Sequence, residues 1–170
     1  MRIQQVMRSP IHTCYVWDNA NRAAQILWEQ RCGALVVVDN QERLVGILTD
    51  RDLCMAAYTQ GKRLAEIPVE SVMSRKVYYC GPDNSLDVAE DIMRLHQVRR
   101  VPVVDERCHP VGIVSMGDIL RHEYEGKREA PMHELARVVG EIVGSASTAP
   151  PPPVSNTNAQ LFSLQRVDAS

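Results

Sequence analysis

The segment GILTDRD at residues 46–52 recurs as GIVSMGD at residues 112–118, and this recurrence decides the fold. A shift of 66 positions, the difference between 46 and 112, superimposes the first half of the chain on the second without a gap. The VM pair at residues 6–7 then falls on the VM pair at residues 72–73. Identities at both ends and in the middle, all at one offset, indicate an internal repeat. The sequence therefore predicts two copies of one structural unit.

Both copies predict the element order β-α-β-β-α. An extended segment comes first, a stretch with helical periodicity follows, two apolar strands form a hairpin, and a second helix closes the unit. In the first copy these elements are expected at residues 11–16, 20–27, 35–38, 44–48 and 51–58. In the second copy they are expected at residues 77–80, 86–93, 101–104, 111–114 and 117–124.

The two copies are expected to share one core. A unit of ~60 residues buries too little surface to be comfortably stable alone. The link between the copies, residues 59–71, carries Ile67 and Val69, which favours a packed connection over a flexible one. We therefore expect an α/β (α+β) fold in which the first repeat (1–60) and the second repeat (61–126) pack their sheets together, with the helices outside. The alternative is two independent units.

The chain changes in character beyond residue 126. Apolar residues recur at helical spacing within residues 127–144, which is compatible with a C-terminal helix. Residues 145–170 contain four consecutive prolines and few large apolar side chains, so we expect a flexible, polyproline-like tail. A proline-rich docking site is the alternative.

Charge and composition exclude several classes of protein. The chain has 19 Lys and Arg against 21 Asp and Glu, a net charge of −2, and so lacks the positive excess of sequence-independent nucleic-acid binders. Its apolar runs fall far short of the ~20 residues of a membrane-spanning helix. Its N-terminal segment is not that of a signal peptide. We therefore expect a cytoplasmic protein with no nucleic-acid or membrane partner.

Cysteine and histidine spacing gives no sign of a disulfide framework or a metal site. The five cysteines are odd in number and widely spaced, without a C-x-x-C pair, and the five histidines include no H-x-x-x-H pair. We expect reduced thiols and no metal. Cys14 and Cys80 occupy equivalent positions in the two copies, which leaves a redox-responsive protein as a weaker alternative.

A hydroxyl residue precedes an aspartate by three positions in both copies, as Thr49 with Asp52 and Ser115 with Asp118. This spacing is typical of a capping box, in which the hydroxyl caps a helix and the carboxylate complements the helix dipole. A second interpretation adds a ligand, because a carboxylate in the first helical turn can accept both hydroxyls of a ribose while the helix N-terminus attracts phosphate. The spacing alone favours capping and does not decide between them.

The doubled pattern resembles a pair of cystathionine-β-synthase-type (CBS) domains, also called a Bateman module, of the stand-alone bacterial type. The resemblance covers about residues 1–125 and rests on the VM pairs, the two G-h-h-[ST]-x-x-D segments and the run HQVRRVPVVD at residues 96–105. It implies two repeats related by pseudo-two-fold symmetry. It also implies a cleft with up to two sites for AMP, ADP, ATP or related adenosine compounds such as NAD and S-adenosylmethionine.

The resemblance further implies roles for individual residues. Asp52 and Asp118 would hold ribose hydroxyls, and Thr49 and Ser115 would contact ribose or phosphate. The base would lie near a set of residues drawn from both copies, namely Ile11, Thr13, Val77, Tyr79, Val101 and Pro102. Phosphate would be held by arginines, whose planar guanidinium suits it, namely Arg51, Arg99 and Arg100.

The two implied sites are expected to be unequal. Arg99 and Arg100 have Gly33 and Ala34 in their places in the first copy. We expect the site that uses Asp118, or the one that faces the two arginines, to bind phosphate better.

The sequence lacks the G-x-S-x-G, P-loop and G-x-G-x-x-G motifs. We therefore expect a free-standing regulatory or sensory module and not an enzyme. It would bind an adenine nucleotide and transmit the signal to an unidentified protein partner. The main alternative is a structural interaction module whose cleft holds no nucleotide. We also expect a homodimer, because the apolar stripes of the helices exceed what one module's core needs and the resembled family commonly pairs its modules.

Overall fold

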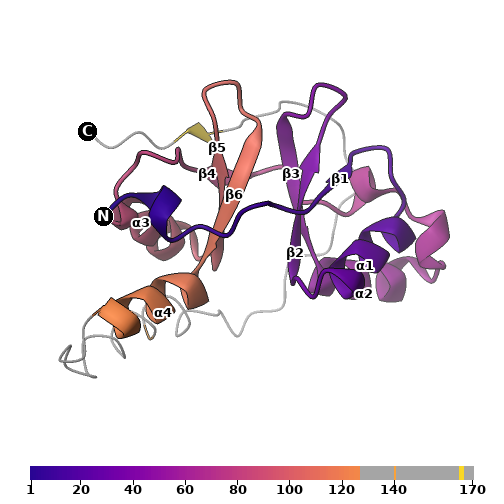
Figure 1. Ribbon diagram of the computed structural model, residues 1–170. Helices are drawn as coiled ribbons and strands as arrows, with labels where there is room; N and C mark the ends of the chain where they lie inside the picture. The colour runs from indigo at the N-terminus through magenta and orange to yellow at the C-terminus, as the bar shows by residue number, and fades with distance from the viewer. Residues whose placement is uncertain (127–139, 141–164, 167–170) are drawn as a thin grey trace.

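The computed structural model describes residues 1–126, 140 and 165–166, and its elements follow the predicted order twice (Figure 1). The first repeat contains β1 (Thr13–Tyr15), α1 (Ala20–Glu29), β2 (Ala34–Val38), β3 (Leu44–Thr49) and α2 (Asp50–Gln60). The second repeat contains β4 (Tyr78–Tyr79), α3 (Leu86–His96), β5 (Arg100–Val104), β6 (Pro110–Ser115) and α4 (Met116–Gly126). The β-α-β-β-α prediction is confirmed, with first strands shorter than expected.

The two sheets have matching topology. In the first repeat β1 pairs in parallel with β2, and β2 pairs in antiparallel fashion with β3. In the second repeat β5 and β6 form the same hairpin, and Cys80 joins β4 to β5 through a parallel bridge to Val103. Both hairpins carry a register shift at equivalent places, between Val37 and Val38 and between Val103 and Val104. The repeat seen in the sequence is therefore a repeat of strand register as well.

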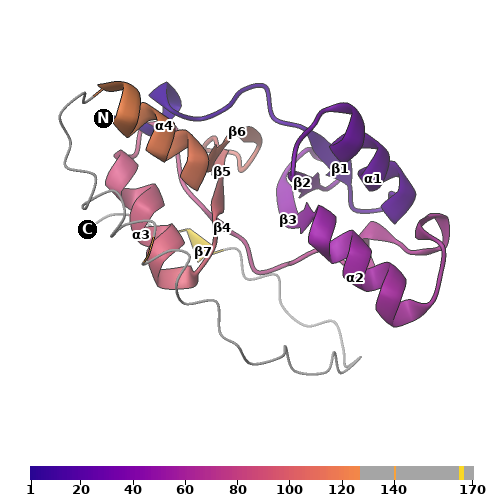
Figure 2. The ribbon, with the colours of Figure 1, turned by 90° about the horizontal axis from the view of Figure 1, so that it is seen from below.

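A shared apolar core joins the two sheets. In Figure 2 the helices α1 and α2 lie on one side and α3 and α4 on the other, with strands β3 and β6 toward the middle. The buried residues between the sheets come from both repeats, namely Val36, Val38, Leu44, Val77, Tyr79 and Val104. Burying apolar surface between the two sheets favours one module over independent units. The predicted arrangement of packed sheets with outer helices is confirmed.

Each repeat also receives a segment that precedes the other. The N-terminal turn η1 (Ile3–Gln5) packs into the second repeat, where Ile3 is fully buried, and the chain then crosses to β1 (Figure 1). The link contains the turns η2 (Leu64–Glu66) and η3 (Val69–Ser71), and its Ile67 and Val69 are fully buried in the first repeat. The expectation of a packed link is confirmed.

The methionine of each recurring VM pair contacts the recurring glycine of the other repeat. A Cβ atom at Gly46 would lie 2.6 Å from the sulfur of Met73, and one at Gly112 would lie 2.5 Å from the sulfur of Met7. Each methionine therefore packs over the bare backbone of a glycine in the other repeat's hairpin. This contact explains why both motifs recur at the same offset.

The C-terminal expectations fall largely outside the described residues. The helix expected at 127–144 lies outside them except for Gly140, which is helical. The tail expected at 145–170 lies outside them except for β7 (Gln165–Arg166), which pairs in parallel with β4. These two residues depart from the expectation of a flexible tail, because they pair with the edge strand β4.

Candidate functional site

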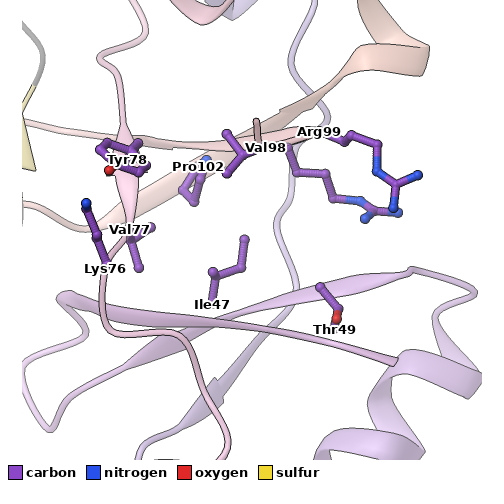
Figure 3. A pocket seen from close by; sticks show the side chains of 9 residues that line it. Ile47, Thr49, Lys76, Val77, Tyr78, Val98, Arg99 and Pro102 are labelled. Carbon is purple, nitrogen blue, oxygen red and sulfur yellow. The ribbon is translucent and has the colours of Figure 1, made fainter. Parts of the chain in front are cut away.

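A pocket opens between β3 of the first repeat and the second repeat, and we call it the Thr49 pocket. Figure 3 shows Ile47 and Thr49 on one wall, with Pro102, Val98 and Arg99 facing them. The full lining consists of Ile47, Thr49, Lys76, Val77, Tyr78, Val98, Arg99, Arg100 and Pro102. The pocket therefore combines apolar surface with a hydroxyl at a helix N-terminus and three cationic side chains.

Thr49 and Asp52 form the predicted capping box at the start of α2. The Thr49 backbone N–H donates to Oδ2 of Asp52 at 2.8 Å, and its hydroxyl donates to the same oxygen at 2.6 Å. The Asp52 backbone N–H donates back to the Thr49 hydroxyl at 3.3 Å. The second oxygen of Asp52, Oδ1, has no partner among the described residues. The capping interpretation is confirmed. Asp52 does not itself line the pocket, but it is hydrogen-bonded to the lining residue Thr49 and keeps one acceptor oxygen.

The cations come from the second repeat. Arg99 is exposed and Arg100 is half-buried at the start of β5. The Arg100 guanidinium reaches across to the first repeat, where a Cβ at Gly33 would lie 2.7 Å from its Nη2 atom. Gly33 thus leaves the space that Arg100 occupies. The departure of the first copy from an Arg-Arg pair therefore makes room for an arginine of the second copy.

Tyr78 provides an aromatic surface and lies between Val77 and Tyr79, the two residues of this segment that were named for the base. Its ring stacks on His96 with centroids 3.5 Å apart and planes inclined by 4°. The Lys76 ammonium lies 5.5 Å from the Tyr78 centroid. Because successive strand residues face opposite sides, Tyr78 lines the pocket while Tyr79 packs between the sheets. A strand of two residues is too short for this alternation to be visible in the sequence, so the sequence alone does not distinguish Tyr78 from Tyr79.

The structure brings together five of the thirteen predicted site residues as lining of this pocket, namely Thr49, Val77, Arg99, Arg100 and Pro102. Val101 and Tyr79 do not line it, because both side chains are buried in cores. Arg51 is exposed on α2, outside the lining. Ile11 and Thr13 belong to the first repeat's opening segment, equivalent to the one that lines the pocket from the second repeat.

Ser115 and Asp118 lie in the second repeat and form a different environment, which we call the Asp118 position. The Ser115 backbone N–H donates to Oδ2 of Asp118 at 3.0 Å, and Nε of Arg8 donates to Oδ1 at 2.6 Å. Arg121 lies 3.4 Å from the same Oδ1. Asp118 is only 5% exposed. Asp118 and the arginine pair were named as alternative marks of the better phosphate site. They lie at different sites, because Arg99 and Arg100 line the pocket together with Thr49.

Asp118 makes the stability of the fold depend on pH. Burial acts to raise its pKa, but hydrogen bonds from Ser115 and Arg8 outweigh burial and hold the pKa below its ordinary value of 3.8. A carboxyl with a lowered folded-state pKa stabilises the fold above its unfolded pKa and loses that contribution as pH falls through the folded pKa. We expect the excess melting temperature of the wild type over Asp118→Asn to be constant near neutrality and to shrink below about pH 4. Thermal melts of both proteins between neutral and acidic pH measure it, and a pH-independent gap would contradict it.

The equivalent cysteines are poor candidates for redox chemistry. Cys14 and Cys80 are free thiols, 2% and 1% exposed, in the cores of their repeats. Burial raises the pKa of each to about 12. Since the thiolate is the reactive form, this disfavours the redox-responsive alternative.

Within residues 1–126, 140 and 165–166, no group of three or more His, Cys, Asp or Glu side chains is placed to hold a metal ion. In the same residues no helix combines the length and apolar character required to cross a bilayer.

Comparisons with known sequences match both repeats. The sequence profile of the CBS domain matches residues 3–58 and 69–125. The CBS domain-containing protein YhcV of Bacillus subtilis is 36% identical over 117 residues, which cover 69% of this chain and 81% of YhcV. Hypoxic response protein 1 of Mycobacterium tuberculosis is 33% identical over 132 residues, which cover 78% of this chain and 87% of that protein.

Solved structures agree with the sequence comparison. The CBS domain pair of protein MJ0100, in complex with 5′-methylthioadenosine and S-adenosylmethionine, has a TM-score of 0.68 and 29% identity, covering 75% of this chain and 98% of that one. Hypoxic Response Protein I with two coordinated zinc ions has a TM-score of 0.65 and 31% identity, covering 72% of this chain and 98% of that one. With the same profile matched twice and the same paired fold, the chain belongs to the CBS domain family as a tandem CBS pair.

Proposed function

We propose that this protein is a regulatory module that binds an adenine nucleotide or a related adenosine compound in the Thr49 pocket and passes the signal to a protein partner. The observation that carries the proposal is the placement of three chemistries around one pocket. A ribose would meet Thr49 of the lining and Asp52, which is hydrogen-bonded to it. A base would lie against the apolar and aromatic wall at Val77 and Tyr78, and phosphate would meet Arg99 and Arg100.

The adenosine ligands of the MJ0100 domain pair support this ligand class. A ligand regulates only by binding two conformations with different affinity. The module's two repeats share a core and exchange their leading segments, so a ligand wedged between β3 and β5 would contact both repeats at once. Such a contact can bias their relative arrangement, which is the form of signal we propose.

A thermal-shift panel of AMP, ADP, ATP, NAD and S-adenosylmethionine tests the proposal. A ligand at about 100 times its Kd stabilises the folded state by about 2.7 kcal/mol. For a chain of this size that gain raises Tm by roughly 5–10 °C. We expect at least one compound to do so. A flat response to the whole panel would favour the alternative of an interaction module that binds no nucleotide.

Arg100→Ala is expected to weaken AMP and ATP more than adenosine. The guanidinium is a charge-assisted donor to phosphate, and its removal leaves the ribose and base surfaces in place. Calorimetric titration of adenosine and AMP into the wild type and the variant measures the difference. An equal loss for both ligands would show that Arg100 supports the pocket wall and does not contact phosphate.

We also propose a homodimer formed through the helices of the first repeat. Trp28 of α1 is 85% exposed and Tyr58 of α2 is 82% exposed. A groove between these helices is lined partly by Ala24, Trp28 and Ala57. Large exposed aromatic side chains beside an apolar groove are typical of protein–protein contacts. Light scattering should give twice the chain mass, and Trp28→Glu should reduce it to one; a monomeric wild type would contradict the dimer.

A further inference from the structure

Arg8 and Ser74 occupy equivalent places in the two repeats, since 8 and 74 differ by the repeat offset of 66. Arg8 exchanges backbone hydrogen bonds of 2.9 and 3.1 Å with Ile113 of β6. Ser74 exchanges backbone hydrogen bonds of 2.9 and 3.0 Å with Ile47 of β3. The backbone is therefore paired in the same way at both places, and the side chain is what differs.

This difference changes the state of the two aspartates. At the Asp118 position, Arg8 donates a hydrogen bond to Oδ1 and Ser115 donates one to Oδ2, so both carboxylate oxygens have partners. At the Thr49 pocket, the backbone N–H and hydroxyl of Thr49 donate to Oδ2 of Asp52. In the part of the chain that the structure describes, Oδ1 of Asp52 has no partner. One carboxylate can accept a ribose hydroxyl directly, and the other cannot do so without losing an ion pair.

We propose that Arg8 closes the ribose-binding position of the second repeat, so that the module takes one adenosine-type ligand, at the Thr49 pocket, where two equivalent repeats would otherwise offer two sites. The inference rests on the proposed function and specifies its stoichiometry. An incoming ribose would have to displace the guanidinium from a carboxylate that is 5% exposed. Losing a charge-assisted hydrogen bond at such a place disfavours the exchange.

Further differences at equivalent positions act in the same direction. Arg121 adds a second cation 3.4 Å from Asp118, whereas the equivalent position in the first repeat is Met55. The phosphate-facing Arg99 and Arg100 are replaced by Gly33 and Ala34 at the positions equivalent to them. At the Asp118 position the arginines contact the carboxylate itself. At the Thr49 pocket, Arg99 lies on the wall that faces Thr49 (Figure 3), and Arg100 lines the same pocket.

Swapping the equivalent residues tests the inference with adenosine as the probe. We expect calorimetry to give one adenosine per chain for the wild type and two for Arg8→Ser. The double variant Arg8→Ser/Arg121→Met, which gives the second repeat the residues of the first, should bind the second adenosine more tightly. Ser74→Arg should place a guanidinium on Asp52 and weaken binding at the Thr49 pocket by roughly 10- to 100-fold.

The outcomes separate this inference from the proposed function. Two adenosines per wild-type chain, or a double variant that still binds one, would overturn the closure by Arg8 and leave the proposed function standing. No heat with the wild type, together with a flat response to the nucleotide panel, would overturn the proposed function, and a site gained by Arg8→Ser would then still support the closure. No heat with the wild type and with both Arg8 variants, together with the same flat response, would overturn both.

Discussion

Asp52→Asn is expected to weaken AMP binding by roughly 30- to 1,000-fold, because an ionised carboxylate that accepts ribose hydroxyls contributes about 2–4 kcal/mol to binding. Its Oδ2 is fixed by the backbone and hydroxyl of Thr49, which orients Oδ1 without side-chain rearrangement. The amide retains one oxygen and removes the charge. Titration calorimetry of both proteins with AMP measures the loss.

The repeat supplies the matched control for this variant. Asp118→Asn makes the same chemical change at the equivalent residue, where Arg8 already occupies the carboxylate. It should lower stability and leave AMP affinity within about two-fold, since about 0.4 kcal/mol corresponds to that factor. If Asp118→Asn abolished binding and Asp52→Asn did not, the assignment of the site to the Thr49 pocket would be wrong.

Ile3→Ala is expected to destabilise the module by about 2–5 kcal/mol, a large effect for a residue so near the N-terminus. Ile3 is fully buried in the second repeat, and η1 is held there by backbone bonds from Ile3 to Asn84 and from Gln4 to Pro82, both at 3.0 Å. Removing three carbons leaves a cavity among residues of the other repeat. Urea unfolding measures the change in the free energy of unfolding.

Gln4→Ala provides the comparison for Ile3→Ala. Gln4 is exposed in the same turn, and exposed substitutions usually change stability by less than about 0.5 kcal/mol. Equal, small effects for both variants would show that the N-terminal segment does not stabilise the second repeat. A large effect for Ile3→Ala alone would establish the exchange of leading segments in solution.

The element order could be read from the sequence because the repeat supplied every pattern twice. The strand β2 is an apolar segment that ends in three consecutive valines, and α1 begins after Asn19, whose side chain accepts from the Arg22 backbone N–H at 2.9 Å. Local chemistry of this kind is visible in a sequence. The crossing of Ile3 into the second repeat was not predicted, because a long-range exchange leaves no periodic signal.

The sequence could predict residues of the candidate site, but not which of them lie opposite one another. The sequence singled out Thr49 with Asp52 and Arg99 with Arg100, but which motif faces which depends on how the sheets pack. Tyr78 was not singled out because a strand of two residues gives no alternation from which to choose between it and Tyr79. The ion pair between Arg8 and Asp118 joins residues 110 positions apart, and no local pattern indicates such a contact.

Methyl NMR of isoleucine side chains during an AMP titration tests the central claim most directly. Ile47 lines the Thr49 pocket, and Ile113 is its equivalent on β6 beside Arg8. The methyl groups of these two isoleucines therefore report on the equivalent positions of the two repeats in one spectrum. We predict that the Ile47 methyl resonance shifts to saturation while the Ile113 resonance stays in place. A saturating shift at Ile113, alone or together with Ile47, or unmoved resonances at millimolar AMP and millimolar S-adenosylmethionine, would contradict the account.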